Sequence, residues 1–162
     1  MQFVLEKPLT PSDLRGKALV HWTAWHEAYP GLVSEDFLER MTLAKCEEIA
    51  FAHPENMLVA KDGGRVVGFV AWGDRGEEAP GVGEIFALYV LKEYYGTGMG
   101  KMLFEAGLEA LKAQGTYETI VLWVLKDNRR AIRFYEKCGF RATGEEMYSQ
   151  RIDAWEIQMV LS

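Results

Sequence analysis

The sequence has few cysteines and no long hydrophobic run. Cys46 and Cys138 are the only two cysteines, each inside a predicted helix, which excludes a disulfide framework. No apolar run approaches the roughly 18 residues that a membrane-spanning helix needs. The first ten residues, MQFVLEKPLT, lack the basic-then-apolar layout of a secretory signal. These absences favour a cytoplasmic protein with no membrane partner.

The sequence also has fewer basic than acidic residues. Eighteen Lys and Arg residues against 24 Asp and Glu residues give a net charge of −6, which argues against a nucleic acid as a partner. The three histidines show no metal-ligand pattern, so we expect no bound metal. Hydrophobic residues make up 49% of the chain and charged residues 26%, as in ordinary globular proteins. At 162 residues, the chain is most simply one domain, residues 1–162.

A strand, a glycine-rich turn and a helix follow one another between Gly83 and Ala113. Residues 84–91 are apolar and rich in β-branched and aromatic side chains, which predicts a buried strand. The turn Gly96-Thr97-Gly98-Met99-Gly100 follows, and residues 101–114 are strong helix formers with an apolar face. A helix start exposes unpaired N–H groups and the positive end of its dipole, and glycines let the backbone approach an anion. This arrangement predicts a ligand that carries phosphate groups.

Two familiar phosphate-binding loops do not fit this turn. A Walker-type loop needs a glycine five residues before the Gly-Lys pair and Ser or Thr after it, but Tyr95 and Met102 occupy these positions. A dinucleotide fingerprint needs a third glycine where Lys101 stands, and its strand should open a βαβ unit near the start of a domain. A nucleotide-binding protein of either kind is therefore disfavoured.

The rest of the chain alternates between strand-like and helix-like segments. The patterns predict strands at residues 2–6, 57–60, 66–72 and 119–125, two strands within 141–161, and helices at 11–29, 34–50 and 128–138. Asp62-Gly63-Gly64 is a hairpin signal between the second and third strands. Strands on both sides of the central strand–helix unit, with four helices in all, predict an α/β (mixed α+β) fold. Its mixed sheet should be covered by helices on both faces.

A second motif points to a family. Residues Asn128 to Phe140 read NRRAIRFYEKCGF, which matches the pattern Asn-x-x-Ala-x-x-Phe-Tyr-Glu-Lys-x-Gly-Phe of the GNAT (Gcn5-related) N-acetyltransferases. Gly98 and Gly100 resemble the acyl-coenzyme A loop of that family, with Tyr95 where Gln or Arg is usual. Residues 25–32, WHEAYPGL, are similar to the N-terminal region of one GNAT subgroup. The chain thus resembles the GNAT family over most of its length.

The resemblance implies a fold and a ligand. The GNAT sheet is mixed, mostly antiparallel and has about seven strands, and acetyl-coenzyme A lies between its central strand and the next parallel strand. By matched position, the central strand should pair with the pantetheine arm, the glycine turn should hold the pyrophosphate, and the following helix should contact the coenzyme. The residues so implied are Leu88, Tyr89, Val90, Gly96, Thr97, Gly98, Met99, Gly100, Lys101, Asn128 and Tyr135. Five basic residues are candidates for binding the 3′-phosphate: Lys101, Lys126, Arg129, Arg130 and Arg133.

Acetyl transfer to an amine poses two proton problems. A lysine-like amine has a pKa of about 10.4, so presenting it neutral near pH 7 costs roughly 4–5 kcal/mol. The resemblance makes Tyr135 the candidate general acid for the departing thiolate and Glu84 the candidate general base. The Val90 N–H is a candidate donor to the developing oxyanion. Trp25, Tyr29 and Glu84 are the candidate acceptor-binding residues. Further aromatic candidates for that pocket are Trp72, Tyr148 and Trp155.

The resemblance favours an N-acetyltransferase that moves an acetyl group directly from acetyl-coenzyme A to a primary amine of a small molecule or a peptide. A catalytically silent coenzyme-binding or regulatory module on the same fold is the alternative. The sequence leaves the identity of the amine open, and it leaves open whether the protein is a monomer or a homodimer.

Overall fold

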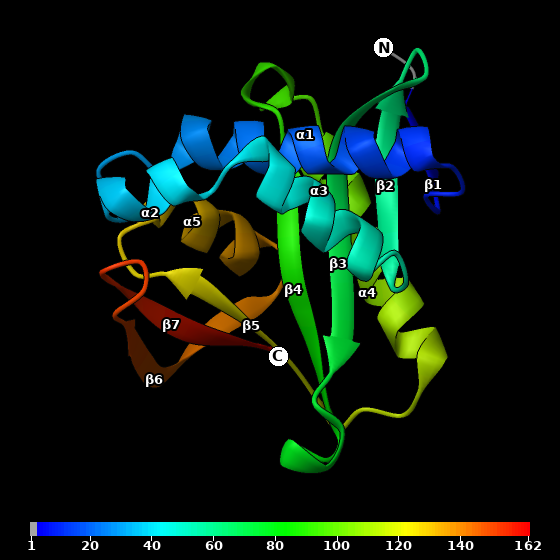
Figure 1. Ribbon diagram of the computed structural model, residues 1–162. Helices are drawn as coiled ribbons and strands as arrows, with labels where there is room; N and C mark the ends of the chain where they lie inside the picture. The colour runs from blue at the N-terminus through cyan, green and yellow to red at the C-terminus, as the bar shows by residue number, and fades with distance from the viewer. Residues whose placement is uncertain (1–2) are drawn as a thin grey trace.

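A mixed sheet runs through the centre of the molecule (Figure 1). The computed structural model describes residues 3–162, and within them seven strands pair in the order β1-β2-β3-β4-β5-β7-β6. β4 and β5 are parallel, and every other neighbouring pair is antiparallel. The strands are β1 (Phe3–Glu6), β2 (Met57–Asp62), β3 (Arg65–Asp74), β4 (Val82–Val90), β5 (Thr119–Leu125), β6 (Phe140–Ser149) and β7 (Ala154–Leu161). The predicted mixed, mostly antiparallel sheet is confirmed. Gln2, where the first strand was expected to begin, lies outside the described residues.

Helices cover both faces of the sheet, as predicted (Figure 1). On one side, which we call the α1 face, lie α1 (Pro11–Ala28), α2 (Glu35–Arg40) and α3 (Leu43–Ala52). On the other side, the α4 face, lies α4 (Met99–Gln114), with α5 (Arg129–Lys137) packed beside it. Across residues 3–162, no helix combines the length and apolar character needed to cross a membrane.

Two apolar clusters fix these layers. The larger one joins the sheet to α4, where Leu103 and Phe104 are fully buried. α4 approaches β3 so closely that a Cβ added to Gly107 would lie 2.7 Å from Val70 Cγ2. The second cluster joins α1, α2 and α3 around the fully buried Cys46. Since burial of apolar surface contributes about 25 cal/mol per Å², these clusters hold the helices against the sheet at fixed positions.

The segment predicted as one helix over residues 34–50 is two helices. α2 ends at Arg40, and the Thr42 hydroxyl accepts a hydrogen bond of 3.1 Å from the Lys45 N–H, which makes Thr42 the N-cap of α3. A threonine that satisfies the first N–H groups of a new helix competes with continuation of the old one. The prediction of a single helix here, and of four helices in all, is therefore wrong.

β4 bends near its middle. Its pairing with β3 skips Phe86, which is an extra residue on β4, and a bulge of this kind bends a strand. Pairing between β4 and β5 extends only from Val82 to Ile85 on the β4 side. From Phe86 onwards, the two parallel strands separate, and the candidate site lies between them.

Candidate active site

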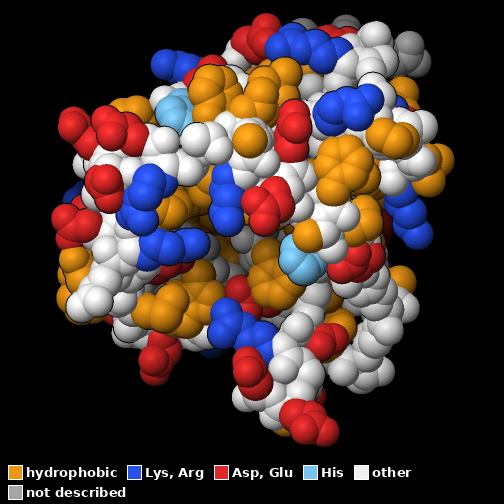
Figure 2. Space-filling view, viewed as in Figure 1, with side chains coloured by type: hydrophobic (Ala, Val, Ile, Leu, Met, Phe, Trp, Pro, Cys, Tyr) orange, Lys and Arg blue, Asp and Glu red, His pale blue; other side chains and the backbone are white. Residues whose placement is uncertain are grey.

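A cavity of about 610 Å³ opens where β4 and β5 separate. Its walls come from Ile85–Val90 of β4, Leu122–Leu125 of β5, and parts of α1, α5, β7, the glycine turn and the turn between β6 and β7. The space-filling view shows the α1 face hollowed below α1 and α2, with charged and hydrophobic side chains around the hollow (Figure 2). We call the part beside the glycine turn and α5 the turn end. The part beside α1 and the β6–β7 turn is the α1 end.

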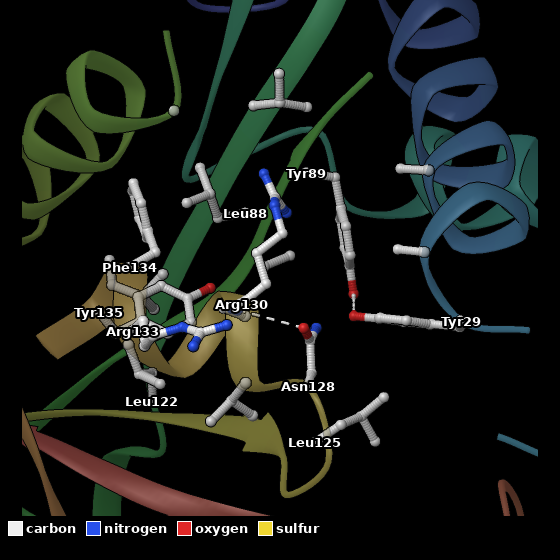
Figure 3. A pocket seen from close by; sticks show the side chains of 18 of the residues that line it. Tyr29, Leu88, Tyr89, Leu122, Leu125, Asn128, Arg130, Arg133, Phe134 and Tyr135 are labelled. Carbon is white, nitrogen blue, oxygen red and sulfur yellow. Dashed lines mark hydrogen bonds between the residues drawn. The ribbon is translucent and has the colours of Figure 1, made fainter. Parts of the chain in front are cut away.

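The separated strands leave backbone groups available to a ligand. Beyond Ile85, β4 makes no pairing with β5, yet Leu88, Tyr89 and Val90 all line the cavity (Figure 3). Backbone N–H and C=O groups need hydrogen-bond partners, and an extended ligand rich in amides can supply them as an added strand does. The predicted position of the pantetheine arm thus coincides with an unpaired strand edge.

The glycine turn presents a start of α4 that no side chain caps. Gly96 and Gly98 have φ angles of 78° and 87°, in the left-handed region that favours glycine. Gly98 is the N-cap residue, and the N–H groups of Gly98, Gly100 and Lys101 have no hydrogen-bond partner within residues 3–162. Unpaired N–H groups at the positive end of a 16-residue helix form an anion site. The turn therefore fits a phosphate group.

Two residues of the predicted turn face away from the cavity. The Thr97 hydroxyl donates a hydrogen bond of 2.6 Å to the Tyr94 carbonyl, and the Met99 side chain is fully buried in the core. The Met99 N–H donates a long bond of 3.4 Å to the Thr97 hydroxyl. Neither residue lines the cavity. A contact between either residue and the coenzyme therefore stays a prediction, and the backbone would make it.

Basic side chains gather at the turn end. Lys101, Arg130 and Arg133 line the cavity, and the close-up shows the two arginines projecting from α5 (Figure 3). The Arg130 guanidinium stands 3.5 Å from the centre of the Tyr95 ring. Lys126 instead pairs with Glu146 at 2.9 Å and lies outside the cavity, as does the fifth candidate, Arg129.

Asn128 links β5 to α5 at the cavity wall. Its side-chain oxygen accepts a hydrogen bond of 3.3 Å from the Ala131 N–H and so caps α5 (Figure 3). The side-chain amide N–H₂ group makes no hydrogen bond within residues 3–162 and remains available to a ligand.

Tyr135 lines the cavity from α5 (Figure 3). Its ring packs against Phe104 and Phe134, with ring centroids 5.3 and 5.5 Å away. Burial, with smaller contributions from Tyr29 and Cys138, raises the pKa of the Tyr135 hydroxyl well above its ordinary value. The hydroxyl therefore stays protonated at neutral pH, as a proton donor must.

Aromatic side chains form the α1 end. Trp25 and Tyr29, two of the candidate acceptor-binding residues, line the cavity, with ring centroids 4.6 Å apart. The Tyr29 hydroxyl donates a hydrogen bond of 3.3 Å to the Tyr89 hydroxyl (Figure 3). Burial is the main cause that raises the pKa of Tyr89 to about 12, so both hydroxyls are neutral near pH 7. Trp25 and Tyr29, spaced four residues apart at the end of α1, thus both contact Tyr89 of the central strand.

The other three aromatic candidates lie elsewhere. Trp72 is buried in the main core, and the cavity is lined by neither Trp72 nor Tyr148 nor Trp155. Tyr148 and Trp155 are exposed neighbours on β6 and β7, with ring centroids 5.5 Å apart.

Glu84 is buried but does not line the cavity. Its Oε1 atom accepts a hydrogen bond of 3.0 Å from Arg75 Nε, and the two side chains form an ion pair. Burial raises the pKa of the Glu84 carboxyl, and Arg75 opposes that rise. Glu84 pairs with Gly73 across the sheet, and the Phe86 ring lies over Gly73.

A second carboxylate, which the sequence analysis missed, does line the cavity. Glu156 on β7 is half-buried at the α1 end, and burial is the main cause that raises the pKa of its carboxyl. Glu84 adds to that rise through its negative charge. No motif marks Glu156, because only the sheet order, with β7 beside β5, brings it to the cavity.

A family model described as the acetyltransferase (GNAT) family matches residues 19–140. The chain belongs to the GNAT family. Over 127 residues it is 30% identical to YuaI of Bacillus subtilis, an uncharacterized N-acetyltransferase, covering 76% of this chain and 72% of YuaI. It is 31% identical over 119 residues to the mycothiol acetyltransferase of Mycobacteroides abscessus, covering 72% of this chain and 38% of that protein. The chain spans about a third of the length of the mycothiol acetyltransferases that it matches.

Solved structures share the fold of this GNAT protein over nearly the whole chain. PH1933 from Pyrococcus horikoshii has a TM-score of 0.76 and 25% identity, covering 99% of this chain and 98% of that one. The PaiA N-acetyltransferase from Thermoplasma acidophilum, solved in complex with coenzyme A, has a TM-score of 0.74 and 22% identity, with 98% of each chain covered. The predicted family and fold are thereby confirmed, and with them membership of an acetyltransferase family that uses acetyl-coenzyme A.

Proposed function

We propose that the protein moves an acetyl group directly from acetyl-coenzyme A to a primary amine of a small molecule or a peptide. The observation that carries the proposal is the unpaired edge of β4, which leads through the cavity to the uncapped start of α4. One domain over residues 1–162, a cytoplasmic location, a monomer or homodimer and the absence of a metal stay predictions.

The coenzyme would lie along this path. The backbone of Leu88–Val90 would pair with the amides of the pantetheine arm, and the N–H groups of Gly98, Gly100 and Lys101 would hold the pyrophosphate. The Asn128 side chain would donate to the arm from the opposite wall. Of the five basic candidates for the 3′-phosphate, the three that line the cavity are Lys101, Arg130 and Arg133.

Two side chains would handle the protons. Acetyl-coenzyme A supplies an activated acetyl thioester; the transfer forms a C–N bond, breaks the C–S bond and releases one proton from the amine. The Tyr135 hydroxyl, which is protonated at neutral pH, would donate its proton to the departing thiolate, whose thiol has a pKa of about 8.5, and would regain a proton from water. Glu84, whose pKa burial raises, would accept the amine proton through water because its carboxylate lies outside the cavity wall.

One observation favours the alternative of a catalytically silent module. Glu84 is already paired with Arg75, so its carboxylate is partly committed to a structural contact. A silent module would bind acetyl-coenzyme A and release no thiol with any amine.

An amine panel separates the two functions. The purified protein would be mixed with acetyl-coenzyme A and polyamines, aminoglycosides, amino acids or short peptides, and released thiol would be measured. We expect amine-dependent thiol release that Glu84→Gln lowers by about 10²–10⁴-fold. Tight coenzyme binding without thiol release on any amine would favour the silent module.

A further inference from the structure

The α1 end of the cavity carries two charges of opposite sign that the proposed transfer leaves unassigned. Glu156 lines the cavity from β7, and Arg151 lines it from the turn between β6 and β7. Within residues 3–162, neither side chain has an ion-pair partner. The other basic side chains of the cavity gather at the turn end, where the coenzyme phosphates are expected.

The Arg151 guanidinium packs against an aromatic ring, and its N–H groups make no hydrogen bond within residues 3–162. Its guanidinium carbon stands 5.1 Å from the centre of the Phe37 ring, and Phe37 is buried on α2. A guanidinium that stacks on an aromatic face leaves the N–H groups at its edge available, and these match a carboxylate in a two-point contact. Arg151 thus offers an anion site at the mouth of the cavity.

Glu156 offers the complementary group. It is half-buried beside Glu84, Tyr29, Tyr89 and Arg151, and a partly desolvated carboxylate is stabilised when a cation binds beside it. The Arg151 charge lowers the pKa of Glu156, but the two side chains form no ion pair within residues 3–162, so a ligand cation can still pair with the carboxylate. The Trp25 and Tyr29 rings at the same end can hold an ammonium group against their faces.

We propose that the acceptor is a small zwitterionic amine whose ammonium group binds beside Glu156 and whose carboxylate binds Arg151. The proposal rests on the acetyl transfer proposed above and names its acceptor class: amino acids and related amines that carry a carboxylate a few bonds from the nitrogen. A cavity of about 610 Å³ that also receives a pantetheine arm leaves room for a ligand of this size. Glu156 is here a positioning residue for the ammonium form, which loses one proton to water before the attack and a second to the general base as the C–N bond forms.

Matched acceptors test the Arg151 half. Thiol release would be measured with amino acids and their amides, and kcat/KM compared at equal concentrations of the ammonium form. We expect wild type to prefer the acid by about tenfold or more, Arg151→Gln to abolish the preference, and Arg151→Glu to favour diamines instead. Arg141→Gln, at an exposed β6 position outside the cavity, is the matched control and should leave kcat/KM unchanged.

The pH profile tests the Glu156 half. Glu156→Gln should raise KM for every amine by about tenfold and leave the acetyl-coenzyme A Kd unchanged, and Glu156→Asp should restore part of the loss. In wild type, kcat/KM should fall at acid pH as the Glu156 carboxyl is protonated. The charged and titratable groups that face Glu156 are Glu84, Arg151, Tyr29 and Tyr89. Glu84 also titrates in that range, whereas the two tyrosines do not, so Glu156→Gln should retain only the fall in kcat/KM that protonation of Glu84 causes.

The outcomes separate this inference from the function on which it rests. Thiol release with many amines, equal for acids and amides in wild type and Arg151→Gln, would overturn the zwitterionic acceptor and leave the acetyl transfer standing. If Glu156→Gln had the wild-type KM and the wild-type fall of kcat/KM at acid pH, the role of Glu156 in binding the ammonium group would be overturned, and the acetyl transfer would still stand. An absence of thiol release with every amine would overturn the proposed transfer itself.

Discussion

Replacing Gly98 with alanine should weaken coenzyme binding as well as lower the stability of the fold. Gly98 has a φ of 87° and no heavy atom within 4 Å of an added Cβ, so the substitution meets strain but no clash. A non-glycine residue in the left-handed region costs about 1–2 kcal/mol. The unfolding free energy of Gly98→Ala should fall by that amount.

The loss of binding follows from what the added methyl group would do. Gly98 is the N-cap of α4, and its unpaired N–H group lies beside those of Gly100 and Lys101. A phosphate pushed away by the Cβ would lose about one charge-assisted hydrogen bond, about 1.5–3 kcal/mol. The Kd for acetyl-coenzyme A should therefore rise about tenfold to 150-fold.

The chain offers a matched control for this substitution. Gly144 on β6 has a φ of 96° and also has no heavy atom within 4 Å of an added Cβ, yet it lies outside the cavity. Gly144→Ala should lose the same stability in urea unfolding and should bind acetyl-coenzyme A like wild type in calorimetry. Equal affinities of Gly98→Ala and wild type, or an equal weakening in both variants, would refute the role of the glycine turn.

Two other residues give predictions of different kinds. Tyr135→Phe keeps the ring packing, so kcat should fall about 10²–10⁴-fold with little change in stability, whereas Tyr117→Phe, whose hydroxyl bonds Asp74 outside the cavity, should leave kcat unchanged. Equal turnover of Tyr135→Phe and wild type would remove the tyrosine as the acid. Asp13→Asn should lower the unfolding free energy at pH 7 by about 1–3 kcal/mol, because Asp13 pairs with Lys61 at 2.7 Å. Its hydrogen bond with Lys61 is the main cause that lowers the pKa of Asp13 below 3.8, so this stability is present above that pH and is lost as the pH falls through the lowered pKa. Urea unfolding at pH 7 and at lower pH should show the gap between variant and wild type closing; a constant gap would contradict the role of the charge.

Features set by local sequence were predicted well. β5 spans Thr119–Leu125 as expected, since a continuous apolar run bounded by polar residues leaves little choice of register. α1 begins at Pro11 as expected, because the Thr10 hydroxyl caps it by accepting a hydrogen bond of 3.1 Å from the Asp13 N–H. The glycine turn was found because positive φ angles require the residue type that the sequence shows there.

Features set by tertiary contacts were not predictable in the same way. Glu156 reaches the cavity only because β7 inserts between β5 and β6, an order that no local pattern encodes. Glu84 lies on the central strand as expected, but its partner Arg75 comes from the loop after β3, and the ion pair depends on how that loop folds back. Trp72 is apolar enough for a pocket or a core, and its register opposite Ile85 places it in the core.

The first experiment to make is a calorimetric titration of the folded protein, freed of carried-over coenzyme, with acetyl-coenzyme A, ATP and NAD. The separated strands and the uncapped α4 start predict micromolar binding of acetyl-coenzyme A and much weaker binding of ATP and NAD. No binding of acetyl-coenzyme A, or equally tight binding of ATP or NAD, would contradict the assignment of this cavity to the coenzyme.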